Sequence, residues 1–86
     1  MEEKTALYKT DKFKEEEVKI VLEEVIKSLT ERNYNAYSQL VGYLMSGDPG
    51  YISSYQDARR KITSIDRSVI LDYLIRKSLG DKKWDI

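Results

Sequence analysis

Apolar residues recur every three or four positions through most of the chain, which predicts helices rather than strands. The first stripe lies in residues 14–31 and covers about 140° of the helix circumference at ~100° per residue. Glutamates at positions 15–17 suit a helix start because they interact favourably with the helix dipole. We therefore expect a helix over residues 14–31, with an apolar face made of Val18, Val21, Leu22, Val25, Ile26 and Leu29.

A second helix is predicted over residues 36–46. Asn33 is suited to a left-handed connection, and Asn35 is an N-cap residue for the helix that follows. One side of this helix is small, because Ser38, Gly42 and Ser46 follow one another at intervals of four. A glycine inside a helix costs about 1 kcal/mol relative to alanine. We expect close packing against this side within the domain, and a ligand groove there is the less favoured alternative.

The segment "SGDPGYISSY", residues 46–55, separates the second helix from the third. Gly47 is expected to end the second helix in a left-handed conformation, and Asp48, Pro49 and Gly50 suit a type II turn. Ser53 and Gln56 have the spacing of a capping box. Turn chemistry does not account for the two large amphipathic rings of Tyr51 and Tyr55.

The third and fourth helices are predicted over residues 54–64 and 66–79. Tyr55, Ala58 and Ile62 should face inward from the third helix, while Asp57 and Lys61 are spaced to form an ion pair. Apolar residues surround nearly the whole fourth helix, and three short helices cannot cover all of them. One side of it is therefore expected to meet a second copy of the chain. These apolar residues are Val69, Ile70, Leu71, Tyr73, Leu74, Ile75 and Leu79.

These patterns predict an all-α fold, a compact bundle of four short helices that forms an intertwined or face-to-face homodimer. The expected organisation is a flexible N-terminal arm at residues 1–13, a helical domain at residues 14–80 and a C-terminal tail at residues 81–86. An 86-residue chain suffices for one small domain.

The composition of the chain argues against several kinds of active site, metal site and partner. The chain has neither cysteine nor histidine, which removes thiol chemistry, the commonest general base and the usual zinc ligands. No phosphate-binding glycine loop or nucleophile motif occurs, so we expect no enzyme, no metal and no cofactor. The 15 basic residues balance 15 acidic ones, which makes nucleic acid an unfavoured partner. No apolar run is long enough to span a membrane, so a cytoplasmic protein is expected.

A long stretch of the sequence resembles a known family. "QLVGYLMSGDP" at residues 39–49, followed by "YI", "DAR" and "DR" at matching spacing, is similar to the central motif of the IreB/ReoM family. These are small regulatory proteins of Gram-positive bacteria. The resemblance implies an all-helical homodimer that is a substrate of a membrane-bound serine/threonine kinase. It also implies control of cell-wall homeostasis, in part through Clp-protease turnover of an enzyme that begins peptidoglycan precursor synthesis.

The resemblance also assigns residues. The family's phosphoacceptor threonine in "KTALY" corresponds to Thr5, and Thr10 is a second hydroxyl with a weaker match. Arg59 and Arg67 correspond to two family arginines. Together with three residues of the segment 46–55, they form the expected partner-binding set: Arg59, Arg67, Asp48, Tyr51 and Tyr55.

Three functional hypotheses remain at this point. The leading one is a non-enzymatic dimeric regulator that is switched by phosphorylation of its arm. The second is a small helical nucleic-acid-binding module that reads its target with the third helix. The third is a purely structural dimerisation domain, in which Thr5 has no consequence.

Overall fold

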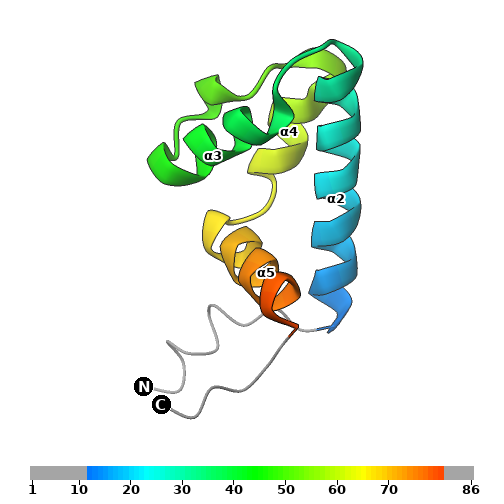
Figure 1. Cartoon of the computed structure of the whole chain (residues 1–86), viewed down its shortest axis with the longest axis vertical. Coiled ribbons are helices and arrows are strands. Elements are labelled where there is room, and N and C mark those ends of the chain that lie inside the picture. The colour runs from blue at the N-terminus through cyan, green and yellow to red at the C-terminus, as the bar shows by residue number, and fades with distance from the viewer. Residues whose placement is uncertain (1–11, 81–86) are drawn as a thin grey trace.

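The computed structural model describes residues 12–80, which form four α-helices and two short 3-10 turns (Figure 1). The all-α prediction is confirmed. The predicted second helix matches the observed one at both ends, while the first helix begins two residues earlier than predicted. The elements are α2 (Lys12–Glu31), α3 (Ala36–Ser46), η1 (Pro49–Tyr51), η2 (Tyr55–Asp57), α4 (Ala58–Thr63) and α5 (Arg67–Leu79).

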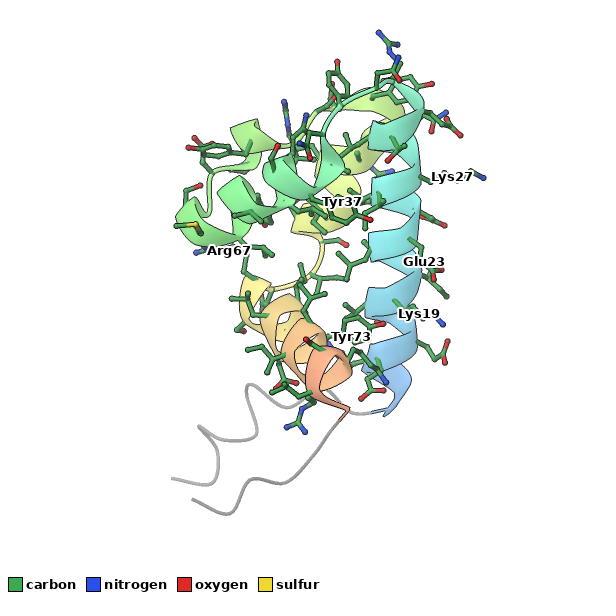
Figure 2. The ribbon with its side chains drawn as sticks, in the orientation of Figure 1. Lys19, Glu23, Lys27, Tyr37, Arg67 and Tyr73 are labelled. Atoms are coloured by element: carbon green, nitrogen blue, oxygen red, sulfur yellow. The ribbon has the colours of Figure 1, made fainter. Side chains whose placement is uncertain are left out.

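The long helix α2 is the element against which the other three helices pack. In Figure 1, α3 and α4 lie beside its C-terminal half and α5 lies beside its N-terminal half. The opposite face of α2 carries Lys19, Glu23 and Lys27, which point away from the bundle (Figure 2). This separation of apolar and charged faces is the one that the spacing of residues 14–31 predicts.

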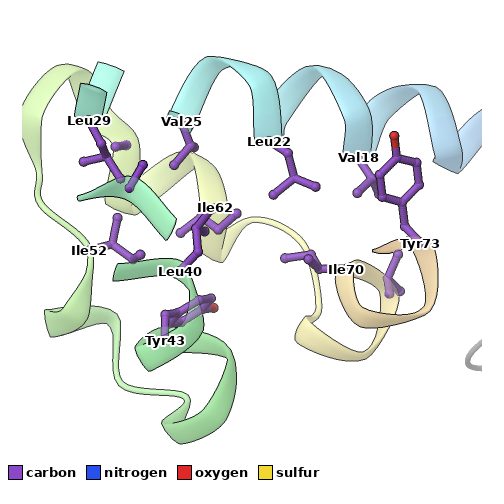
Figure 3. Close-up of a cluster of buried hydrophobic side chains, with 13 residues drawn as sticks. Val18, Leu22, Val25, Leu29, Leu40, Tyr43, Ile52, Ile62, Ile70 and Tyr73 are labelled. Carbon is purple, nitrogen blue, oxygen red and sulfur yellow. The ribbon is translucent and has the colours of Figure 1, made fainter. Parts of the chain in front are cut away.

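The core follows the predicted stripes. Val18, Val25 and Leu29 of α2 have no exposed surface, and they meet buried side chains of the other helices (Figure 3). Val21 and Ile26 are only partly buried, at the edge of the stripe. The buried apolar residues of the described chain are Val18, Leu22, Val25, Leu29, Ala36, Leu40, Tyr43, Ile52, Ala58, Ile62, Val69, Ile70 and Tyr73.

Local capping explains where α3 begins and ends. Asn33 is left-handed, with a φ of 63°, and the Oδ1 of Asn35 accepts a hydrogen bond from the Ser38 amide at 3.1 Å. At the other end Gly47 has a φ of 79°, and its amide donates to the Tyr43 carbonyl. All three features were predicted from the residue types. They fix the direction in which the chain enters the corner that follows.

The third helix differs from its prediction. Residues 55–57 form a 3-10 turn, and the α-helix itself spans Ala58–Thr63. Gln56 and Asp57 are both left-handed, with φ values of 51° and 63°, so they cannot continue an α-helix. Ala58 and Ile62 are fully buried, as expected. The apolar period therefore located the packed part of the helix but not its beginning.

Helix α5 leaves much apolar surface uncovered, as the sequence predicts. Val69, Ile70 and Tyr73 are buried, whereas 38–58% of each of the other large apolar side chains is exposed. These exposed residues of α5 are Leu71, Leu74, Ile75 and Leu79.

Candidate functional site

The corner after α3 is organised by the side chain of Asp48. Its Oδ1 accepts a hydrogen bond from the Gly50 amide at 2.9 Å, and its own amide donates to the Ser46 hydroxyl at 3.0 Å. The Tyr51 amide donates to the Asp48 carbonyl, which makes residues 49–51 a 3-10 turn. The type II turn predicted here is wrong, because Gly50 does not have the positive φ that such a turn requires.

The small side of α3 receives the ring of Tyr51. A Cβ added at Gly42 would overlap this ring, so glycine is the residue that allows the tyrosine to lie against the helix. The predicted close packing within the domain is confirmed, and the neighbour is this side chain of η1. Tyr51 remains 51% exposed, so its outer face is available to a partner.

Arg67 connects the beginning of α5 to the end of α3. Its NH1 group donates to the Leu44 carbonyl at 3.0 Å, and its guanidinium lies against Gly47 (Figure 2). A cation at a helix C-terminus is favourable because the last carbonyls lack partners within the helix. Arg67 is nevertheless exposed, so one side chain both connects two helices and presents positive charge beside Gly47.

Arg59 has an anchoring role of its own. Its Nε donates to the carbonyl of Ile52 at 2.9 Å, and the Ile52 side chain is fully buried. The next residue is also held, because the Ser53 amide donates to the Oε1 of Gln39 at 3.0 Å. Residues 51–53 are therefore fixed from α4 on one side and from α3 on the other.

The turn that precedes α4 places Tyr55 beside a cation. The guanidinium of Arg32 lies 4.8 Å from the centre of the Tyr55 ring, a cation–π contact between α2's end and η2. Tyr55 is partly exposed, so it stays accessible beside Arg32.

Two predicted local interactions of this turn are wrong. Ser53 accepts from the Tyr55 amide, and the Gln56 side chain accepts from the hydroxyl of Ser28 at 2.8 Å instead of closing a capping box. Ser28 is almost fully buried, so leaving its hydroxyl without a partner would be costly. The predicted pair between Asp57 and Lys61 is replaced by ion pairs of Asp57 with Arg60 and of Lys61 with Glu24.

The structure thus arranges the five expected partner-binding residues in two groups. Asp48, Tyr51 and Arg67 surround the end of α3, and Arg59 and Tyr55 lie around the turn into α4. Residues 51–55 connect the groups. Thr5 and Thr10 lie outside the described residues.

Sequence reasoning missed three residues that shape this region. Gln39 belongs to the family motif, but nothing in its spacing indicated that it holds Ser53. Arg32 and Ser28 act through contacts with η2 that are distant in sequence. Their residue types alone carried no signal.

This geometry predicts that two adjacent substitutions affect the stability of the fold very differently. Gly47→Ala should lower the free energy of unfolding by about 1–3 kcal/mol, because a side chain is strained at positive φ and would push against Arg67. Asp48→Asn should change it by less than about 0.5 kcal/mol, because the amide oxygen can still accept from Gly50. Urea denaturation of both variants tests this, and equal stability of Gly47→Ala and wild type would contradict it.

A second feature is an apolar groove between α2, α3 and α5. All of its lining side chains are aliphatic or aromatic: Leu22, Ile26, Tyr37, Leu40, Val41, Leu44 and Leu74. Tyr37 and Val41 are 69% and 54% exposed, and Met45 continues their row along α3 with 81% exposure. Contiguous exposed apolar surface of this kind is typical of protein contacts. We call this surface the α3–α5 groove.

Other kinds of site are not evident between residues 12 and 80. No group of three acidic, cysteine or histidine side chains is placed to hold a metal ion there. Among the described helices, none combines the length and apolar character that crossing a bilayer requires.

Comparison with protein families identifies the family to which the chain belongs. The family model described as IreB regulatory phosphoprotein matches residues 3–80, which include every element described above. The match begins before Thr5 and extends through the corner and α5. The chain therefore belongs to the IreB family of regulatory phosphoproteins.

Proposed function

We propose that this protein is a regulator switched by a serine/threonine kinase at Thr5, with Thr10 as at most a secondary site. It acts by binding proteins through the corner that carries Asp48, Tyr51, Tyr55, Arg59 and Arg67. The regulated process is cell-wall homeostasis, in part through Clp-dependent turnover of an enzyme of peptidoglycan precursor synthesis. It carries out this role in the cytoplasm, as a homodimer and without a catalytic activity of its own.

The observation that supports this most is the family match, because it covers the threonine and the corner together. The corner adds a physical reason. Exposed arginines and tyrosines are favoured in protein interfaces, and here hydrogen bonds to backbone carbonyls hold both arginines in place. A pre-positioned side chain loses less conformational entropy when a partner binds.

The position of Thr5 suits a switch. Thr5 precedes the start of α2 at Lys12 by seven residues and lies outside the described residues, so no described helix contains the phosphoacceptor. It adds about −1.5 to −2 charge and three acceptor oxygens. Such a group changes which proteins bind without requiring the core to open.

We expect the cognate kinase to phosphorylate wild type and Thr10→Ala to similar extents, and Thr5→Ala about tenfold less. The reason is that Thr5 has the family's phosphoacceptor context and Thr10 does not. Phosphosite mapping by mass spectrometry gives the distribution. A dominant phosphate on Ser53 or Ser54 would contradict the assignment.

The effect of phosphorylation on partner binding is tested by comparing the proteins captured from a lysate of a Gram-positive bacterium. Phosphorylated and unmodified wild type should capture different partners, and Arg59→Ala should lose partners that Arg60→Ala keeps. Arg60 is a matched control because it is the neighbouring arginine and contacts the exposed Asp57 side chain. Identical partners for all four samples would contradict the proposal.

A further inference from the structure

One side of α5 is an unbroken row of exposed aliphatic residues. Leu71, Ile75 and Leu79 follow at intervals of four, and 41%, 58% and 42% of each is exposed. Buried residues of the same helix, such as Ile70 and Tyr73, face α2 instead. We call this row the α5 outer stripe. About half of this row stays exposed among residues 12–80, although burying it would be favourable at about 25 cal/mol per Å².

The chain continues directly from one end of this stripe. Gly80 ends α5 with a φ of 69°, and its amide donates to the Arg76 carbonyl. A left-handed residue at this position turns the chain back across the end of the helix instead of letting it continue along the axis. The next six residues are "DKKWDI", in which Trp84 and Ile86 are the apolar members.

The spacing of these two residues fits the stripe. Trp84 and Ile86 are two positions apart, so an extended segment places both on one side, about 6.6 Å from each other. Successive members of the stripe are four helical residues apart, or about 6 Å. Lys83 and Asp85 would then face solvent on the other side of the segment.

The length of the segment fits as well. Four extended residues from Gly80 to Trp84 reach at most about 14 Å. Ile75 is five helical residues before Gly80, or about 7.5 Å along the axis, so Trp84 can reach both Leu79 and Ile75. Lys82 and Lys83 would stay near the C-terminal end of α5, where positive charge is favourable.

We propose that residues 81–86 fold back and dock on the α5 outer stripe of the same chain. Trp84 covers Leu79 and Ile75, and Ile86 lies toward Leu71. This docking uses residues outside the α3–α5 groove and does not depend on the proposed function. It leaves the groove, and not the outer stripe, as the apolar surface open to another protein.

Trp84 is the chain's single tryptophan, so its fluorescence reports directly on the tail. We expect wild type to emit at shorter wavelength than free tryptophan and to resist acrylamide quenching. Ile75→Gln should shift the emission to that of free tryptophan and increase quenching several-fold. Ile20→Gln is the matched control, because Ile20 is a similarly exposed helical isoleucine on α2 (51%), and it should change neither measurement.

Mixed samples distinguish docking within a chain from docking on a second copy. Chains carrying Trp84 and Ile75→Gln are refolded with an excess of chains carrying Trp84→Phe and an intact stripe. Docking within a chain predicts that Trp84 stays exposed in this mixture. Recovery of the short-wavelength emission would overturn the proposal in favour of a second copy. Free-tryptophan emission in wild type, or an unchanged spectrum of Ile75→Gln, would overturn it as well.

Discussion

Ile52→Ala is expected to lower the free energy of unfolding by about 2–5 kcal/mol, the usual cost of removing a large aliphatic side chain from a core. Ile52 has no exposed surface, although it lies in the connection between η1 and η2. It is one of the six largest fully buried side chains of the described residues. A domain of this length has a total stability of about 4–13 kcal/mol, so the loss is a large part of the whole.

The same substitution should disturb the corner. The carbonyl of Ile52 accepts from Arg59, and the adjacent Ser53 amide donates to Gln39. The buried side chain keeps these backbone groups in register with their partners. Partial loosening of residues 51–53 should therefore accompany the loss of stability and appear as faster hydrogen exchange at the Ser53 amide.

Urea denaturation measures the first effect and amide exchange the second. Ile20→Ala is the control, because Ile20 is 51% exposed on α2, and we expect a change within about 0.5 kcal/mol. A loss below 1 kcal/mol for Ile52→Ala would mean that the corner does not depend on its apolar anchor.

The sequence predicted those features that depend only on residues close together in the chain, namely the buried helix faces and the helix ends. The face of α2 and the buried pair Ala58 and Ile62 of α4 follow from spacing alone, because a helical stripe must be buried against something. Asn35 and Gly47 set the ends of α3 because their effects are local. For α3, the predicted and observed bounds agree to the residue.

The prediction of where the third helix begins was wrong because a contact between distant residues decides it. Gln56 has the right spacing from Ser53 for a capping box, but its side chain bonds to Ser28, which is 28 residues away. A buried hydroxyl that needs a partner outweighs a local cap that solvent can replace. Nothing in the sequence near Gln56 indicates that Ser28 will be buried beside it.

In the candidate site, too, contacts between distant residues could not be predicted from the sequence. The resemblance identified Arg59 and Arg67, but not that each donates to a backbone carbonyl of another element. Such contacts require the tertiary arrangement of α3, α4 and α5. The structure therefore adds an anchoring role to residues that sequence reasoning assigned to partners alone.

We expect a homodimer in solution in which the α3–α5 groove of each copy receives the exposed row of α3 from the other. Tyr37, Val41 and Met45 form that row, of which Tyr37 and Val41 also line one side of the groove. A two-fold contact uses the same surface on both copies, and a surface that combines a groove with a protruding row can complement itself. A stable contact of this kind buries about 800 Å² per copy.

Val41→Glu should weaken this dimer at least about 100-fold, because each interface would bury two unpaired carboxylates, and about 3 kcal/mol suffices for that change. Val41 is 54% exposed in the single chain, so the fold itself should tolerate the substitution. Ile20→Glu places the same charge at similar exposure on α2, outside the groove, and should leave the dimer intact. Sedimentation equilibrium distinguishes these outcomes. A monomeric wild type at micromolar concentration would refute the dimer. A Val41→Glu protein that dimerises like wild type would place the contact elsewhere.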